Sequence, residues 1–148
     1  MGRRNKSANA RSYESLWAVR SNSYSVTDIV GGHNVSKTMP SEYEIPWADG
    51  SFDVVVSGQT LEHVRNPFRL FGEMGRVLRS RGYMCHVAPS SGPNHDAVDC
   101  WRWMRDSFKA VADETGFETL ADWIDGGSSG GGRGKRWGDH TWVGRKIS

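Results

Sequence analysis

From Ile45 to Gly58 the chain reads Ile-Pro-Trp-Ala-Asp-Gly-Ser-Phe-Asp-Val-Val-Val-Ser-Gly, and this stretch carries most of the information about the fold. Ala48–Ser51 has the small and polar residues of a turn. Phe52–Val56 is a short apolar run rich in β-branched residues, which is typical of a strand buried in a parallel sheet. Ligands of open parallel sheets bind beyond the carboxyl ends of the strands. We therefore expect the residues that end this run, Ser57–Gln59, to border a binding site.

The residues that follow predict a helix and then a second strand. Pro67 suits the first turn of a helix, since its missing N–H needs no partner there. Apolar residues recur at helical spacing from there to Arg79, and Gly82 ends the stretch. Tyr83–Ala88 has the composition of the next strand, so the sequence predicts a strand–helix–strand crossover unit.

Several spaced motifs in this region resemble those of one enzyme family. They are Ile45-Pro46-Trp47, Asp49–Val54, Leu61-Glu62-His63 and Glu73–Leu78, in that order. The combination is similar to the class I methyltransferases that use S-adenosylmethionine, in the branch called methyltransferase domain type eleven. Pro89–His95 and Val98–Arg102 resemble a sub-branch of the same family. The resemblance implies an α/β fold with a Rossmann-like sheet and helices on both faces, and S-adenosylmethionine as the cofactor.

The remaining segments predict further alternation of helices and strands. We expect a loose N-terminus over residues 1–11, a helix from Ser12 and a strand over Tyr24–Ile29. A helix capped by Asp106 and closed by Gly116 should follow the central unit. Two final strands are expected over Phe117–Trp123 and His140–Lys146, separated by a flexible Gly-rich loop over residues 126–136.

Length and composition favour one domain over residues 1–148 in a cytoplasmic protein. The chain has 148 residues, which is ordinary for a single core. Cys85 and Cys100 are the two cysteines, and they fit reduced thiols better than a disulfide framework. No apolar stretch is long enough to cross a membrane, so we expect no membrane partner. The net charge of +2 does not by itself favour nucleic acid as a partner.

The resemblance implies a set of cofactor-binding residues. They are Asp28, Glu42, Ser57, Gly58 and Gln59. Asp28 ends a predicted strand, where the family uses an acidic residue to accept hydrogen bonds from the ribose hydroxyls, which suits an acceptor-only carboxylate. The alternative is a strand-end aspartate that faces water or starts a turn. The register places Ser41 or Glu42 near the adenine position, and the backbone of the other three residues near the methionine end.

His63 and His95 are the candidate catalytic residues. Methyl transfer from a sulfonium depends mainly on alignment, and a general base helps where the acceptor must lose a proton. Histidine has a suitable pKa for that role. In the alternative, Glu62-His63 ties the following helix to the sheet, and Asp99 pairs with Arg102 to fasten the loop that carries His95. We expect no metal site, because the chain lacks a Cys-x-x-Cys motif and a pair of histidines at ligand spacing.

The sequence has no recognisable counterpart of the family's opening strand and Gly-rich loop. No apolar strand precedes Tyr24 with room for a crossover helix, and Gly2–Asn9 stands where the loop is expected. We therefore expect an N-terminally truncated methyltransferase, with a second copy or a partner chain covering the missing strand. Its methyl acceptor is expected to be a small molecule, a sugar or a glycolipid precursor. One alternative is a binding or scaffold protein that lost the cofactor, and another is a nucleic-acid-associated protein that uses its basic termini.

Overall fold

A computed structural model describes residues 23–126 and 137–148 of the chain. The chain divides into two compact units, Met1–Pro46 and Trp47–Ser148, and each is described by itself. The predicted loose N-terminus, the helix from Ser12, Gly2–Asn9 and nearly all of the Gly-rich loop lie outside the described residues. Among the described helices, none is long and apolar enough to span a membrane.

The described part of the first unit contains one pair of short strands. β1 (Thr27–Asp28) runs parallel to β2 (Lys37–Thr38). The strand predicted over Tyr24–Ile29 is therefore only two residues long. Side chains explain the shortening: the Ser36 hydroxyl accepts the Val26 N–H at 3.0 Å, and the Asp28 carboxylate accepts the Val30 N–H at 3.0 Å. These bonds occupy backbone donors that a longer strand would use in its ladder.

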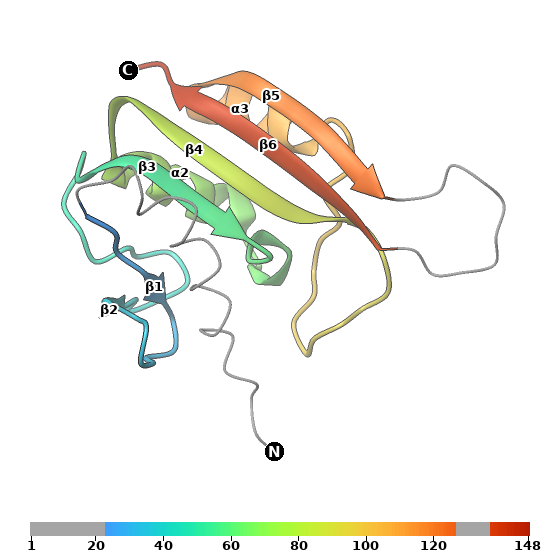
Figure 1. The fold of residues 1–148 in the computed structure, drawn as a ribbon, viewed down its shortest axis with the longest axis horizontal. Coiled ribbons are helices and arrows are strands. Elements are labelled where there is room, and N and C mark those ends of the chain that lie inside the picture. The colour runs from blue at the N-terminus through green and yellow to red at the C-terminus, as the bar shows by residue number, and fades with distance from the viewer. Residues whose placement is uncertain (1–22, 127–136) are drawn as a thin grey trace, which may run out of the picture. The chain divides into compact units, whose positions relative to one another are not determined.

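The second unit contains a four-stranded sheet in the order β3-β4-β6-β5 (Figure 1). The strands are β3 (Phe52–Gly58), β4 (Leu78–Ser91), β5 (Phe117–Gly126) and β6 (Gly138–Lys146). β3 and β4 are parallel, whereas β6 is antiparallel to both β4 and β5. All four strands predicted for this unit are confirmed, and each extends beyond its predicted bounds. β3 includes Ser57 and Gly58, so the prediction that these two residues break the strand is wrong.

The described part of this unit contains two α-helices, in the segments where the sequence predicted them. α2 (Pro67–Val77) begins at Pro67, and the Asn66 side chain accepts the Arg69 N–H at 3.1 Å as an N-cap. The prediction that this helix continues to Arg79 is wrong, because Leu78 is already extended and begins β4. α3 (Ser107–Thr115) follows Asp106, but the predicted cap is wrong, since the Asp106 side chain makes no capping hydrogen bond. The helix ends, as predicted, at a left-handed Gly116 with φ of 79°.

Both described helices pack on the same face of the four-stranded sheet. His86 of β4 and Trp142 of β6 are register partners, so their side chains share one face. The ring of Phe71 from α2 lies 5.4 Å from the Trp142 ring, and the ring of Phe108 from α3 lies 6.0 Å from it. All four side chains are fully buried. This aromatic cluster forms the centre of the core and confirms that Phe71 faces the sheet.

Within the described ranges, β3 pairs with β4 and β1 pairs with β2. No described strand joins these two pairs. The expectation of a missing opening strand concerns residues outside those ranges, so it stays a prediction.

Candidate functional site

The carboxyl end of β3 turns sharply away from the sheet at Gln59. This residue has a positive φ of 53°, and its N–H donates to the Val87 carbonyl of β4 at 2.8 Å. Its side-chain amide donates to the Asp139 carboxylate at 2.9 Å, which fastens the turn to the start of β6. Ser57, two residues earlier, is buried, and Gly58 lies between the two. The break predicted over Ser57–Gln59 thus lies at Gln59 alone, which two hydrogen bonds hold in place.

A single 3-10 turn, η2 (Leu61–His63), follows this strand end directly. The side chains of Leu61 and Glu62 are buried. The Glu62 carbonyl accepts the N–H of Cys100 at 2.7 Å and that of Trp101 at 3.3 Å. These bonds tie η2 to the loop that follows β4. Glu62 thus has a structural role, as the alternative predicted. It connects η2 to this loop, however, and not α2 to the sheet.

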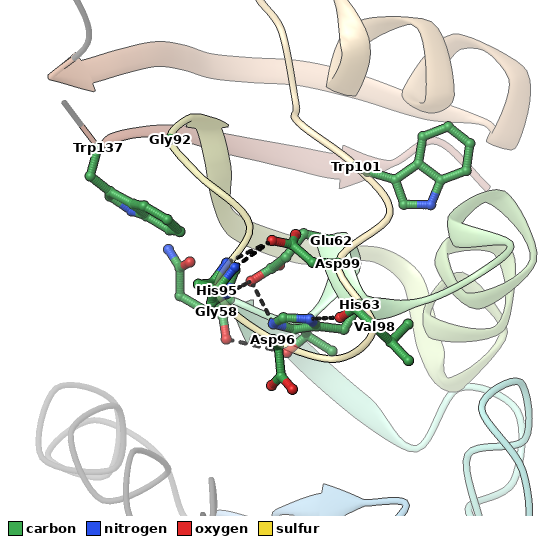
Figure 2. A network of polar contacts seen from close by, with 12 residues as sticks. Gly58, Glu62, His63, Gly92, His95, Asp96, Val98, Asp99, Trp101 and Trp137 are labelled. Carbon is green, nitrogen blue, oxygen red and sulfur yellow. Dashed lines mark hydrogen bonds and ion pairs between the residues drawn. The ribbon is translucent and has the colours of Figure 1, made fainter. Parts of the chain in front are cut away.

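The tertiary structure brings His63 and His95 together with Glu62 (Figure 2). The two imidazole centroids lie 4.9 Å apart, with ring planes at 62°. Glu62 Oε1 lies 3.2 Å from His63 Nε2 and 3.8 Å from His95 Nε2. The Glu62 side chain is 0% exposed, whereas those of His63 and His95 are 16% and 30% exposed. The two imidazoles are thus partly accessible to solvent, whereas the carboxylate between them is buried.

The opposite nitrogen of each imidazole faces an oxygen that accepts hydrogen bonds. His63 Nδ1 lies 2.5 Å from the Val98 carbonyl, and His95 Nδ1 lies 2.9 Å from Asp99 Oδ2. Because a carbonyl only accepts, His63 Nδ1 must carry the proton, and the Asp99 carboxylate selects the same arrangement for His95. Both Nε2 atoms are therefore directed toward the Glu62 carboxylate.

Asp99 is held by Arg102, as the structural alternative predicted. The Arg102 guanidinium donates to both carboxylate oxygens of Asp99, at 2.5 and 2.8 Å. These bonds hold the pKa of the Asp99 carboxyl well below its usual range, and the bond from the His95 N–H at 3.0 Å acts in the same direction. Arg102 also donates to the carbonyls of Gly92 and Pro93 at 3.2 and 2.8 Å. The loop that presents His95 is therefore fastened at both ends.

Trp137, which precedes β6, contacts His95, and sequence reasoning did not predict this contact. Its ring meets the His95 ring edge-on at a centroid distance of 4.9 Å, and its indole N–H donates to Asp139 at 2.9 Å. The Arg102 guanidinium lies over the same ring, 5.8 Å from its centroid. Nothing local in the sequence marks Trp137, because it is far along the chain from the residues that it contacts.

The other two predicted cofactor-binding residues belong to the first unit. Asp28 is half-buried at the end of β1, the strand-end position that the sequence predicted, and its carboxylate also starts the turn to Val30. Glu42 is half-buried and Glu44 is exposed. The ribose and adenine roles of Asp28 and Glu42 stay predictions.

Comparison with known families identifies the central segment. A family model described as a methyltransferase domain matches residues 18–86. This segment, which is less than half of the chain, is similar to that family. An uncharacterized methyltransferase of Schizosaccharomyces pombe is 36% identical over 53 residues, which are 36% of this chain and 19% of that protein. One of Mycobacterium sp. (strain KMS) is 47% identical over 53 residues, which are 36% of this chain and 20% of that protein. The match thus spans about a fifth of the length of these curated relatives.

Solved structures place the whole described sheet in the same fold. An S-adenosylmethionine-dependent methyltransferase from Methanosarcina mazei is similar with a TM-score of 0.58 and 18% identity, over 90% of this chain and 86% of that one. The 4+2 cyclase SpnF is similar with a TM-score of 0.55 and 18% identity, over 78% of this chain and 58% of that one. The predicted α/β, Rossmann-like class I methyltransferase fold is confirmed. The cofactor that the methyltransferase domain indicates is S-adenosylmethionine.

Within the second unit, the ends of the parallel strands β3 and β4 and the loops that follow them build the site. Ser57 and Gly58 end β3, Gln59 and His63 follow it, and His95 follows β4. This is the edge at which open parallel sheets bind ligands.

Proposed function

We propose that this chain transfers a methyl group from S-adenosylmethionine to a small-molecule, sugar or glycolipid-type acceptor, at the edge formed by the carboxyl ends of β3 and β4. The observation that carries the proposal is the meeting of His63 and His95, with ring centroids 4.9 Å apart, beside the Ser57–Gln59 strand end of a methyltransferase domain. The matched segment is short relative to the relatives' length, so the activity is inferred from the site and the family together.

The residues present offer groups of the kind that the cofactor requires. The backbone of Ser57, Gly58 and Gln59 turns off the sheet in a fixed conformation and suits the methionine end. The Asp28 carboxylate, at the end of β1, is an acceptor suited to ribose hydroxyls. Glu42 is the proposed adenine-side acid. When bound, the cofactor supplies an activated methyl group on a sulfonium.

His95 is the better placed of the two histidines to accept a proton from the acceptor. Its side chain is 30% exposed, so a substrate can reach it, and Asp99 holds Nδ1 at 2.9 Å. A carboxylate that orients an imidazole in this way also stabilises the imidazolium that forms. We assign His95 as the general base for a hydroxyl acceptor and His63 as a residue that positions the acceptor. Alignment of the acceptor with the methyl group supplies most of the rate.

Titration calorimetry with S-adenosylmethionine and S-adenosylhomocysteine tests the cofactor part of this proposal. We expect saturable one-to-one binding. Incubation with methyl-labelled cofactor and chromatographic pools of small molecules then tests transfer, with His95→Gln expected to lower product formation while cofactor affinity is kept. Lack of binding to both compounds by the folded chain would refute the proposal and favour a binding or scaffold protein.

A second function deserves a test because of one structural neighbour. SpnF, whose similarity to this chain has a TM-score of 0.55, is named as a 4+2 cyclase rather than as a methyltransferase. The fold alone therefore does not determine methyl transfer. Cofactor binding without label transfer to any pool would favour this alternative, in which the fold keeps the cofactor site and the methyl group is not used.

A further inference from the structure

We propose that Glu62, His63 and His95 form a binding site for a divalent transition-metal ion, such as Zn²⁺ or Co²⁺. Each residue offers one ligand atom, and the three atoms lie within 4.8 Å of one another. Two of them come from η2 and the third comes from the loop after β4 (Figure 2). The ion-binding proposal rests on this geometry and is independent of methyl transfer.

The Nδ1 contacts of the two histidines give the second argument. The Val98 carbonyl lies 2.5 Å from His63 Nδ1, and the Asp99 carboxylate lies 2.9 Å from His95 Nδ1. Histidines that bind metals usually donate their other ring N–H to a carbonyl or carboxylate in this way, which fixes the tautomer and orients the lone pair of the ligating nitrogen. Here both histidines have such an acceptor, and the Nε2 atom of each ring faces Glu62 Oε1.

Charge favours a cation at this position. Glu62 and Asp99 have side chains that are 0% exposed, and the Arg102 guanidinium forms a bidentate ion pair with Asp99. Removing carboxylates from water is costly unless positive charge compensates them. A divalent ion between Glu62 and the two imidazoles would add to the positive charge that Arg102 already supplies nearby.

The donor set selects the class of ion. Two imidazole nitrogens and one carboxylate oxygen suit Zn²⁺, Co²⁺ and neighbouring transition metals, whereas Mg²⁺ and Ca²⁺ prefer oxygen ligands. Ligand atoms of a tetrahedral zinc site lie about 3.3 Å apart, given metal–ligand distances of about 2.0–2.1 Å. Glu62 Oε1 and His63 Nε2 are already 3.2 Å apart, while His95 Nε2 is 3.8 Å from the same oxygen. Both separations from Glu62 are thus close to this spacing, and ion binding would draw His95 nearer to Glu62 and His63.

Three protein ligands leave one coordination position open, as in catalytic rather than structural zinc sites. The partly exposed His63 and His95 side chains place that position toward solvent. In the proposed methyl transfer, an ion here would polarise an acceptor hydroxyl in place of a free His95 base. That role rests on the proposed function, whereas ion binding does not.

Cobalt titration of the full chain, freed of metal with a chelator, tests the site without cofactor. We expect one equivalent of Co²⁺ to give visible ligand-field bands, Zn²⁺ to displace it, and Mg²⁺ to give no heat in calorimetry. His63→Ala, His95→Ala and Glu62→Gln should each weaken Zn²⁺ binding by at least about 100-fold, more than loss of an outer contact does. His33→Ala is the matched control, since His33 is exposed in the other unit.

Three outcomes would overturn the proposal. One is the absence of Zn²⁺ binding by the folded wild-type chain, and another is unchanged Zn²⁺ affinity in the three ligand variants. The third is loss of binding in Cys100→Ser with retention in His95→Ala, since the exposed Cys100 neighbours the site and would then define a thiolate site instead. If circular dichroism shows that an alanine variant is unfolded, the wild-type chain is used instead. Zn²⁺ should then protect His63 and His95 of that chain from modification by diethyl pyrocarbonate. Modification at equal rates with and without Zn²⁺ would also refute the site. Failure of methyl transfer would leave each of these readouts unaffected.

Discussion

The imidazole of His86 stacks on the ring of Phe108, with centroids 5.7 Å apart and ring planes only 5° from parallel. The Trp142 ring lies on it as well, at 5.9 Å and 17°. His86 is fully buried, and in the described part of the chain neither of its ring nitrogens has a hydrogen-bond partner. A titratable ring thus occupies the centre of an aromatic core, where an apolar ring would serve the packing equally well.

Acid should destabilise the fold through His86. Burial lowers the pKa of His86 from 6.5 to about 3, so the unfolded chain binds its proton more readily than the folded chain. The free energy of unfolding should therefore fall by up to about 1.4 kcal/mol per pH unit as the pH drops from 6.5 toward 3, with the full contribution present above pH 6.5. Urea melts of wild type and His86→Phe across this range test it. The variant should show a smaller slope, and parallel curves would contradict the prediction.

Phe71 should be among the most costly core residues to truncate. Its side chain is 0% exposed and its ring lies 4.9 to 5.5 Å from those of His86, Trp142 and Phe117. Phe71→Ala should lower the free energy of unfolding by about 3–5 kcal/mol. Arg69→Ala, on the exposed side of the same helix, should cost less than about 1 kcal/mol. Denaturant melts measure both, and the reverse order would place the wrong face of α2 against the sheet.

Arg102 should matter for stability more than an exposed cation does. Removing it leaves the Asp99 carboxylate, which is 0% exposed, without the two charged hydrogen bonds that it now accepts. Arg102→Ala should therefore cost about 3 kcal/mol and expose the loop after β4 to proteolysis. Lys109→Ala, which breaks the exposed pair with Asp113 in α3, is the control and should cost less than about 1 kcal/mol. Equal melting temperatures for the two variants would mean that the Asp99–Arg102 pair does not hold the loop.

Gly92 should not tolerate a side chain. Its φ is 127°, and a Cβ added there would lie 2.5 Å from Trp137, which contacts His95. Gly92→Ala should lower the free energy of unfolding by about 2 kcal/mol or more. Gly116→Ala has a φ of 79° but open space around the added carbon, so it isolates backbone strain and should cost about 1 kcal/mol. Thermal melts of both variants would contradict this account if Gly116→Ala were the less stable.

Asp28→Ala should weaken cofactor binding more than Glu44→Ala does. Asp28 is half-buried at the end of β1, whereas Glu44 is exposed, and only the first matches the ribose-binding acid of the family. Each hydrogen bond to a charged group contributes about 1.5–3 kcal/mol, so the loss should exceed tenfold in the dissociation constant. Calorimetry with S-adenosylhomocysteine measures it, after circular dichroism has shown that both variants are folded. Equal affinities would contradict the ribose-binding role of Asp28.

The order of helices and strands was readable from local patterns in the sequence. Phe52–Gly58 forms a strand because β-branched residues favour extended backbone, and α2 begins at Pro67 because a proline needs no donor in the first turn. Gly116 closes α3 in the left-handed conformation that glycine adopts without steric cost. Each of these features depends on residues close together in the chain. The end of α2 could not be predicted from local patterns. Leu78 leaves the helix and begins β4, because it pairs there with β3, a strand that is distant in the chain.

The sequence by itself determined the elements, the methyltransferase motifs and the Asp99–Arg102 pair, whose members are three residues apart. Only the tertiary structure decided that His63, His95 and Glu62 share one site and that Trp137 covers His95. The physical reason is the parallel pairing of β3 and β4, which places the segments after both strands at one edge of the sheet. Residues that are widely spaced in the chain meet there, and no local periodicity records such a meeting.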